Sequence, residues 1–239
     1  MQLIDILIRE RKNKTKNGLY RQIQILMAYH SNRIEGSTCS LEETSLLFDT
    51  SSYGVQNPSN DITETFNHFR AFDMIIDTYK QKLSEEYIKA IHGIVKFNSE
   101  DEKRGYAIGD YKKIPNRVGT LSTTKPENVS RDISRLLKNY NNSSSKKLED
   151  LLDFHIKFEQ IHPFQDGNGR VGRLIMFKEC LRNKIKPFII SSDNNLAYKA
   201  CLMAFQLKMN NAMKNFVDFA KQEQLAFDMV IKEIQAKGR

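Results

Sequence analysis

Residues 162–173 read HPFQDGNGRVGR, and this stretch joins two segments that both show helical periodicity. Pro163 disfavours α-helical backbone at His162, so a first helix, predicted over residues 148–161, should end there. A second helix is predicted over residues 169–183. Two glycines flank Asn168 at its start, where several backbone N–H groups can point at one anion. The stretch therefore predicts an anion-binding loop between two helices.

The side chains of this loop indicate what the anion is. Arg170 and Arg173 lie in the first turn of the second helix, where each cation is disfavoured by about 0.3–1 kcal/mol. A di- or triphosphate would offset that cost, because guanidinium groups match phosphate oxygens. Asp166 can hold Mg²⁺ together with substrate phosphates, and His162 suits a general base for a hydroxyl. These features predict transfer from a nucleotide phosphate to a hydroxyl, with Phe164 as an apolar anchor.

The same letters contain a second pattern, GxGxxG, at Gly167, Gly169 and Gly172. Asp193 follows 21 residues after Gly172, which is close to the spacing of a dinucleotide-binding unit. That unit requires a strand before the first glycine, whereas the segment before Gly167 is helical. The sequence also lacks strand–helix alternation elsewhere. The dinucleotide interpretation is therefore disfavoured.

Most of the remaining chain also predicts helices, as its low content of Gly (11) and Pro (5) favours. One helix should run to Ile34, with Gly36 just beyond its end. Capping boxes are predicted at Ser40–Glu43 and at Asp61–Glu64. Residues 105–124 predict a loop or short β-hairpin, and residues 188–190 are the other candidate strand. We expect a mainly α protein made of an N-terminal segment (1–60), a core (61–220) and a C-terminal helix (221–239).

Composition limits the partners and the compartment. The chain of 239 residues carries a net charge of +8, which suits polyanions. Its basic residues are scattered, however, and no nucleic-acid recognition motif is evident, so nucleic acid is disfavoured. Cys39, Cys180 and Cys201 form neither a disulfide framework nor a metal pattern. The cysteines are thus typical of a reducing cytosol, so we expect a cytoplasmic protein. No apolar run is long enough for a membrane span, and no membrane partner is expected.

Residues 162–173 resemble the signature of the Fic family, HxFx(D/E)GNGRxxR, at every defined position. The helical layout of residues 61–219 is similar to a whole Fic core. The resemblance implies a Fic/DOC-type helical bundle with a hairpin flap. It also implies an enzyme that transfers AMP from ATP to a Ser, Thr or Tyr hydroxyl of a target protein and releases pyrophosphate, with Mg²⁺ as cofactor. This modification is called AMPylation.

The resemblance also implies roles for individual residues. His162 would be the base, Asp166 would bind Mg²⁺, Arg170 would hold the β-phosphate and Arg173 the γ-phosphate. The other residues implied are the anion hole (Gly167, Asn168, Gly169), a neighbour of the adenine (Tyr198) and a flap that pairs with the target (Lys112, Lys113, Ile114, Val118, Gly119, Thr120).

A second motif lies far upstream, where residues 31–36 read SNRIEG. It is similar to the family's inhibitory pattern, (S/T)xxxE(G/N), in the class (class II) whose inhibitory helix precedes the core. Ser31 and Glu35 are four residues apart and share one helix face. Glu35 also lies at a helix C-terminus, where a carboxylate is disfavoured. We expect Glu35 to pair with Arg173 and displace the γ-phosphate, which would make the enzyme autoinhibited.

Several functions stay open from the sequence. The target protein is not encoded in any motif and could include a second molecule of this chain. The same scaffold could use another nucleotide donor or remove AMP. A non-enzymatic nucleic-acid or interaction module is the third class. A homodimer that covers apolar helix faces is a further expectation that the sequence does not decide.

Overall fold

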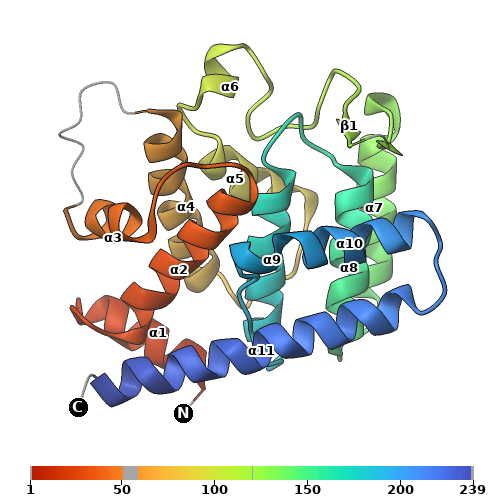
Figure 1. Ribbon diagram of the computed structural model, residues 1–239. Coiled ribbons are helices and arrows are strands. Elements are labelled where there is room, and N and C mark those ends of the chain that lie inside the picture. The colour runs from red at the N-terminus through yellow and green to blue at the C-terminus, as the bar shows by residue number, and fades with distance from the viewer. Residues whose placement is uncertain (1, 51–58, 120, 238–239) are drawn as a thin grey trace.

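The computed structural model describes residues 2–50, 59–119 and 121–237 (Figure 1). In this part of the chain the fold is a bundle of helices with one short hairpin, which confirms the predicted fold class. In chain order the elements are α1 (Leu3–Lys12), α2 (Leu19–Ile34), α3 (Leu41–Thr50), α4 (Asn60–Asp77), α5 (Glu85–Val95), α6 (Glu100–Lys103), β1 (Arg117–Val118), β2 (Leu121–Ser122), α7 (Pro126–Asn141), α8 (Leu148–Ile161), α9 (Asn168–Arg182), a 3₁₀ turn (Ser192–Asn194), α10 (Asn195–Gln206) and α11 (Ala212–Lys237).

Helix α9 lies at the centre of the bundle and packs against α2, α4, α5 and α8 (Figure 1). Every residue from Arg170 to Leu181 is buried. A helix surrounded by protein needs apolar residues on all faces, and its charged residues must be paired. Lys178 and Glu179, for example, form an ion pair of 2.7 Å inside the core. Helix α9 therefore places the loop that precedes it, residues 162–167, in the middle of the fold.

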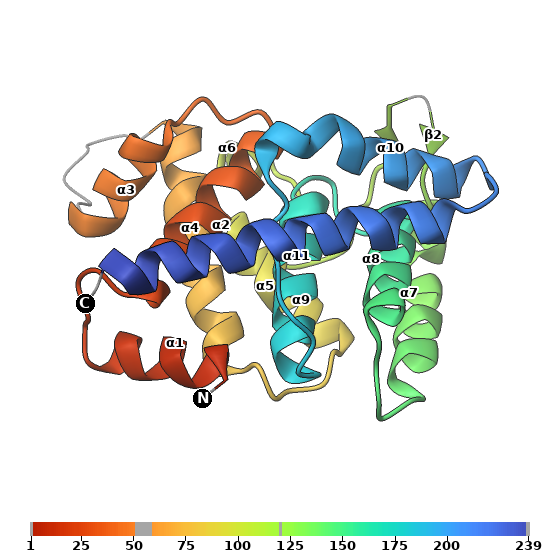
Figure 2. The same cartoon turned by 60° about the horizontal axis from the view of Figure 1, so that its bottom comes forward.

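Helix α11 runs across the bundle and contacts α2, α8 and α10 (Figure 2). A single hydrophobic cluster connects Ile4 of α1, Phe72 of α4, Phe177 of α9 and Phe227 of α11. The N-terminal helices and the long C-terminal helix therefore share one core with the residues between them. None of the described helices is long and apolar enough to span a bilayer.

The helix ends near residues 31–36 agree with the sequence. Helix α2 stops at Ile34, Glu35 is its C-cap, and Gly36 has a φ of 98°, which glycine adopts without strain. The Ser40–Glu43 capping box is confirmed, because the Ser40 N–H donates to Glu43 at 2.7 Å and the Glu43 N–H to Ser40 Oγ at 3.1 Å. The C-cap places Glu35 at the very end of α2.

Two local predictions are wrong. The Asp61–Glu64 pair is not a capping box, since Ser59 caps α4 by accepting the Ile62 N–H at 3.4 Å. Asp61 instead accepts two hydrogen bonds of 2.7 Å from Thr38, and Glu64 is buried on α4, where it pairs with Arg170. Residues 188–190 are not a strand. They form a buried apolar connection, which periodicity alone does not distinguish from a short strand.

The predicted hairpin is present as two short antiparallel strands, β1 and β2, in which Arg117 pairs with Ser122. Gly119 in its turn has a φ of 57°, a left-handed conformation that favours glycine. The hairpin lies at the same end of the bundle as the loop between α8 and α9 (Figure 1).

Candidate functional site

The loop between α8 and α9 begins at His162, which ends α8 in a left-handed conformation with a φ of 50°. Its N–H still donates to Phe158 O at 2.9 Å. This turn follows from Pro163, which excludes α-helical backbone at the residue before it. The imidazole is thereby turned away from the continuation of the helix and faces a cleft.

Two side chains hold this loop in place. The Asn168 amide accepts the Phe164 N–H at 2.8 Å and donates to Phe164 O at 2.9 Å. The Phe164 ring is fully buried and stacks on His92 with parallel planes and centroids 3.8 Å apart. Phe164 is therefore the apolar anchor that the sequence predicts. The Asn168 side chain is engaged within the loop, so only its backbone N–H is oriented toward an anion.

His92 fixes the loop from the other side. The Gly109 N–H donates to Nδ1 of His92 at 3.0 Å, so the ring proton lies on Nε2, which donates to Asp166 O at 3.1 Å. Burial lowers the pKa of His92 to about 3, and the ring is therefore neutral near pH 7. This neutral tautomer donates and accepts at once, which links the segment before the hairpin to the functional loop.

The N-terminus of α9 is the expected anion site, and a carboxylate of the protein lies on it. Gly167 enters the helix with a φ of 79° and gives no side-chain cap. A Cβ built on Gly169 would overlap Oε1 of Glu35 and lie 2.9 Å from Nη1 of Arg173. Glycine at position 169 thus permits an anion to reach the backbone N–H groups at the helix start.

Arg173 connects Ser31 and Glu35 to this helix start. Its guanidinium donates to Ser31 Oγ at 3.0 Å, to Ser31 O at 2.9 Å and to Glu35 Oε1 at 2.6 Å. Burial acts to raise the pKa of Glu35, but the charges of Arg173 and Arg170 outweigh it and hold the pKa below its usual value. Glu35 is therefore ionised at neutral pH, and Ser31, Glu35 and Arg173 form one contact.

Asp166 and Arg170 belong to a second network on the other side of the loop. Asp166 Oδ2 accepts from Lys96 Nζ at 2.8 Å and from Arg170 Nη2 at 2.9 Å. Glu64 forms ion pairs with both Arg170 and Lys96. Burial acts to raise the pKa of Asp166, but Arg170 and Lys96 hold it well below its usual range. The side chain of Asp166 is half exposed.

His162 faces a cleft of about 350 Å³ between α2, α8, α9, α10 and the hairpin. Burial lowers the pKa of His162 to about 4, and the charge of Lys112 acts in the same direction. Its imidazole is therefore neutral near pH 7 and able to accept a proton. The predicted site residues that line this cleft are Glu35, Val118, Gly119, His162, Gly169, Arg173 and Tyr198.

The segment predicted to be the flap starts at a buried residue, Lys112, and has an exposed tip. Lys112 is 3% exposed and donates to Asn116 at 2.6 Å and to Thr123 at 2.7 Å. Its backbone N–H donates to Pro163 O at 2.9 Å, which fastens the flap to the loop of His162. Lys113 and Ile114 are exposed. Thr120 lies outside the described residues.

Tyr198 lies on the α10 side of the cleft. Its side chain is buried, and its hydroxyl forms a hydrogen bond of 2.7 Å with His155 Nε2. The apolar wall beside it includes Ile156, Leu202 and Met203. A flat apolar group would fit against this wall, whereas the charged wall of the cleft is formed by Glu35 and Arg173.

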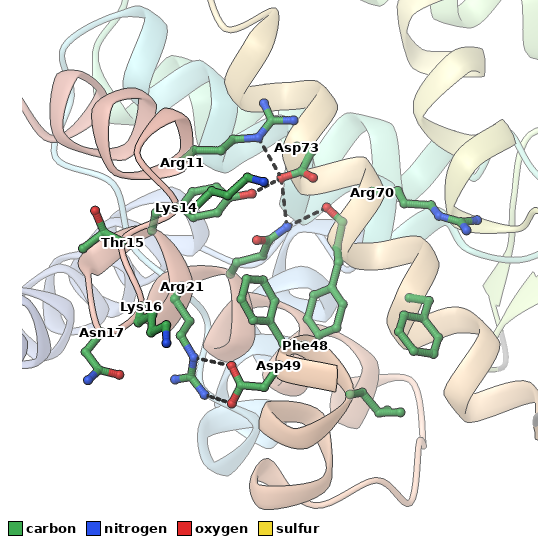
Figure 3. Close-up of a pocket in the computed structure, with 15 residues that line it drawn as sticks. Arg11, Lys14, Thr15, Lys16, Asn17, Arg21, Phe48, Asp49, Arg70 and Asp73 are labelled. Atoms are coloured by element: carbon green, nitrogen blue, oxygen red, sulfur yellow. Dashed lines mark hydrogen bonds and ion pairs between the residues drawn. The ribbon is translucent and has the colours of Figure 1, made fainter. Parts of the chain in front are cut away.

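A larger cavity, of about 840 Å³, lies elsewhere, between the α1–α2 connection, α3 and α4 (Figure 3). Its carboxylates already have partners within the protein. Asp49 accepts from Arg21 at 2.7 Å, while Asp73 accepts from Gln24 at 3.1 Å and pairs with Arg11 at 3.5 Å. None of its described lining residues is a histidine or cysteine. The chemistry therefore points to the smaller cleft.

The sequence does not indicate three residues that contact the loop of His162 or the start of α9. Glu64 was assigned to a helix cap, while Lys96 and His92 lie on a helix far upstream. Periodicity could place His92 and Lys96 on one face of α5, four residues apart. It could not show which loop that face contacts, because the contact joins segments about 70 residues apart.

The segment that carries the loop of His162 is also similar to known proteins. Residues 82–180 match the model of the Fic/DOC family. This part of the chain is similar to a Fic domain. The chain is 25% identical over 195 residues to protein adenylyltransferase fic-1 of Caenorhabditis elegans, covering 77% of this chain and 37% of that protein. It is 27% identical over 179 residues to protein adenylyltransferase Fic of Nematostella vectensis, covering 71% of this chain and 40% of that protein. The chain thus spans less than half the length of these two relatives.

The fold comparison extends beyond residues 82–180. A Fic-domain-containing signaling protein from Bacteroides thetaiotaomicron superposes with a TM-score of 0.79 at 23% identity, and 98% of each chain is covered. Fic-1 (residues 134–508) of C. elegans superposes with a TM-score of 0.76 at 22% identity, covering 92% of this chain and 65% of that one. At these identities the likeness establishes the fold, from the N-terminal helices to α11.

Proposed function

We propose that this chain is a protein adenylyltransferase, an enzyme that transfers AMP from ATP to a hydroxyl of a target protein. The observation that carries the proposal is the shared cleft. A neutral imidazole, His162, and the N-terminus of a buried helix, α9, open onto it together with Arg173. The relatives named protein adenylyltransferase support the same activity.

The proposed reaction needs little covalent chemistry from the protein. The oxygen of the target hydroxyl attacks the α-phosphorus of ATP, its proton passes to His162, and pyrophosphate leaves. Backbone N–H groups at Gly167, Asn168 and Gly169 would bind phosphate oxygens, and Arg173 would hold the γ-phosphate. The β-phosphate is assigned to Arg170, which has to exchange a carboxylate partner for it. The adenine is assigned to the wall beside Tyr198.

The residues around Asp166 fit the proposed Mg²⁺. Its carboxylate is half exposed, and hard carboxylate oxygens combined with phosphate oxygens are the ligands that Mg²⁺ prefers. Three carboxylates (Glu64, Asp101, Asp166) lie within 4.8 Å of one another, but the Lys96 ammonium already contacts all three. Asp166 alone is therefore assigned to the metal. When bound, the ion would neutralise charge on the phosphates.

Autoinhibition by Glu35 is part of the proposal. Its carboxylate contacts Arg173 at 2.6 Å and covers Gly169, the two places that the γ-phosphate would need. Two anions cannot share one guanidinium and one helix start without strong repulsion. ATP would then bind with its phosphates displaced from the geometry for in-line attack. The inhibitory helix would therefore act on substrate position and leave the base in place.

The flap is assigned to the target protein. Val118 and Gly119 line the cleft, and the exposed β1 strand offers backbone groups beside it. Main-chain pairing with an extended target segment is a common mode of peptide recognition. Such pairing would hold a Ser, Thr or Tyr hydroxyl near His162. It is compatible with many targets, including a second copy of this chain.

The deciding experiment compares the wild type with Glu35→Gly, using α-labelled ATP, Mg²⁺ and a cell lysate as the source of targets. We expect at least about a tenfold faster transfer of label in the variant, because removal of a competitor worth 1.4 kcal/mol or more changes occupancy tenfold. Glu233→Gly, which removes an exposed carboxylate on α11, is the matched control and should behave like the wild type.

Mass spectrometry of the labelled products tests the chemistry. An added mass of AMP on a hydroxyl supports the proposal, and a different adduct would show another nucleotide donor or another reaction. Label that is equal in wild type and Glu35→Gly would contradict autoinhibition. No label with either protein would contradict the transferase.

A further inference from the structure

Glu159 lies one turn before His162 on α8, and no part of the proposed reaction uses it. Its side chain is 12% exposed and lines the same cleft. Oε1 is buried without a hydrogen-bond partner among the described residues. A buried carboxyl is disfavoured unless it is paired, so its presence at this position calls for an explanation.

Gly172 makes room for this carboxyl. A Cβ at position 172 would lie 2.8 Å from Glu159 Oε1 and 3.0 Å from His155 Nδ1, so these side chains would have to shift to admit it. Glycine inside a helix is less favourable than alanine by about 1 kcal/mol. Gly172, which disfavours the helix α9, therefore lies against Glu159 of α8, whose Oε1 has no hydrogen-bond partner among the described residues. Both belong to the surroundings of the base.

The carboxyl faces the nitrogen of His162 that does not take the proton. Oε2 of Glu159 lies 3.9 Å from Nδ1 of His162, which makes no side-chain hydrogen bond, while the backbone of Glu159 also acts to raise the pKa of this imidazole. A neutral imidazole that accepts a proton at Nε2 must carry its own proton on Nδ1. At 3.9 Å the contact is too long for a hydrogen bond, but catalytic contacts commonly shorten when substrate is bound.

His162 needs such a partner for the proposed reaction. Its pKa of about 4 makes it a weak base, and efficient general bases have a pKa nearer the working pH. Burial disfavours the imidazolium that forms when the target hydroxyl loses its proton. A carboxylate beside Nδ1 would offset this penalty, as the third member of a catalytic triad does.

We propose that Glu159 is a positioning residue for His162. Its carboxylate accepts the Nδ1–H, fixes Nε2 as the proton acceptor and balances the charge of the imidazolium. The target proton passes to Nε2, while the Nδ1 proton stays on the ring and Glu159 stays ionised. The role in catalysis rests on the proposed transferase activity, whereas the role in setting the tautomer does not.

The ionisation of Glu159 gives this role a pH dependence. Burial raises the pKa of Glu159 to about 8; the charge of Arg173 opposes the rise and that of Glu35 adds to it. Below its pKa the carboxyl is protonated, is a weaker acceptor for the Nδ1–H and carries no charge to balance the imidazolium, so the transfer rate should rise with pH through this pKa. The titratable and charged groups around the pair are Glu35, Lys112, His155, Asp166, Arg173 and Tyr198.

The first test uses the Glu35→Gly background, in which transfer is expected to be fast. Adding Glu159→Gln should lower kcat about 10- to 100-fold, leave the KM for ATP within about twofold, and remove the rise of kcat with pH. Glu149→Gln makes the same substitution at an exposed position of α8 and should leave all three unchanged. An unaltered kcat and pH profile in Glu159→Gln would overturn the proposal.

The second test needs no activity. Nitrogen-15 NMR of the His162 ring at pH 9 reports the tautomer directly. We expect the proton on Nδ1 in the parent and a shift toward Nε2–H in Glu159→Gln, with the thermal midpoint showing that the variant is folded. The same tautomer in both proteins would overturn the proposal. A shifted tautomer without any AMP transfer in the Glu35→Gly parent would support the positioning role and count against the transferase.

Discussion

At the scale of single residues, the site depends on glycines that admit a neighbouring carboxyl group. Gly169 lets Glu35 reach the start of α9, and Gly172 lets Glu159 lie between α8 and α9. A methyl group at either position would meet these groups closer than van der Waals contact. These two glycines of α9 therefore let acidic groups approach the helix closely, in addition to any role in forming the turn.

His162→Ala separates binding from chemistry. In the Glu35→Gly background we expect AMP transfer to fall about 10²- to 10⁴-fold, the usual contribution of a general base. Because the proposed phosphate-binding groups lie on α9, the Kd for ATP by calorimetry should stay within about threefold. Loss of ATP binding in this variant would show that His162 contacts the nucleotide and would contradict the division of roles.

At the scale of elements, α9 carries charged groups at both ends inside the core. Arg170 and Arg173 at its start pair with Glu64, Asp166 and Glu35. At its end Glu179 accepts from Tyr140 at 2.8 Å, from Arg182 at 3.0 Å and pairs with Lys178 at 2.7 Å. The first network can exchange carboxylates for phosphates, since it borders the cleft. None of the residues of the second network lines the cleft of His162, so we assign it a structural role.

Glu179→Ala tests this difference. The substitution leaves the Lys178 ammonium, which is fully buried, without its carboxylate partner. Breaking one side of a buried ion pair destabilises by about 3–5 kcal/mol, and we expect that loss in urea unfolding followed by circular dichroism. Asp218→Ala breaks an exposed pair with Lys214 and should change the free energy of unfolding by about 0.5 kcal/mol or less. Equal effects in both variants would show that Glu179 is not structural.

At the scale of the whole molecule, the same core that positions the site also buries four histidines in neutral form. Burial lowers the pKa of His68, His92 and His155 to about 3 and that of His162 to about 4. In the unfolded chain these groups titrate near pH ~6.5. As pH falls below that value, the unfolded state binds protons that the folded state does not. Acid should therefore destabilise the fold.

The expected loss is steep. Each such histidine contributes about 1.4 kcal/mol per pH unit between the unfolded and folded pKa values, so the upper limit for these four is roughly 5.5 kcal/mol per unit. We expect the urea midpoint to fall sharply from pH 7 to pH 5. His68→Leu removes one group whose ring nitrogens have no partner among the described residues and should reduce the slope by about a quarter. An unchanged slope would mean that His68 takes up its proton in the folded state.

Local sequence determined the helices, most of their ends and the loop of His162. Pro163 ends α8, the Ser40–Glu43 box starts α3, and the glycines shape the entry to α9, because each of these effects acts within a few residues. Local sequence did not, however, determine which anions balance Arg170 and Arg173. Their unfavourable place at a helix start predicts an anion, but three carboxylates of the chain itself already supply part of that charge.

Tertiary structure alone decided which distant groups meet. The family resemblance predicted that Glu35 pairs with Arg173. That Glu35 also occupies the space beside Gly169 is decided only by the packing of α2 against α9. The sequence contained no sign that Lys96 lies among three carboxylates or that Glu159 faces Nδ1 of His162 through the space left by Gly172. Helix periodicity specifies the face on which a side chain lies, whereas the neighbour that it meets depends on how the whole core packs.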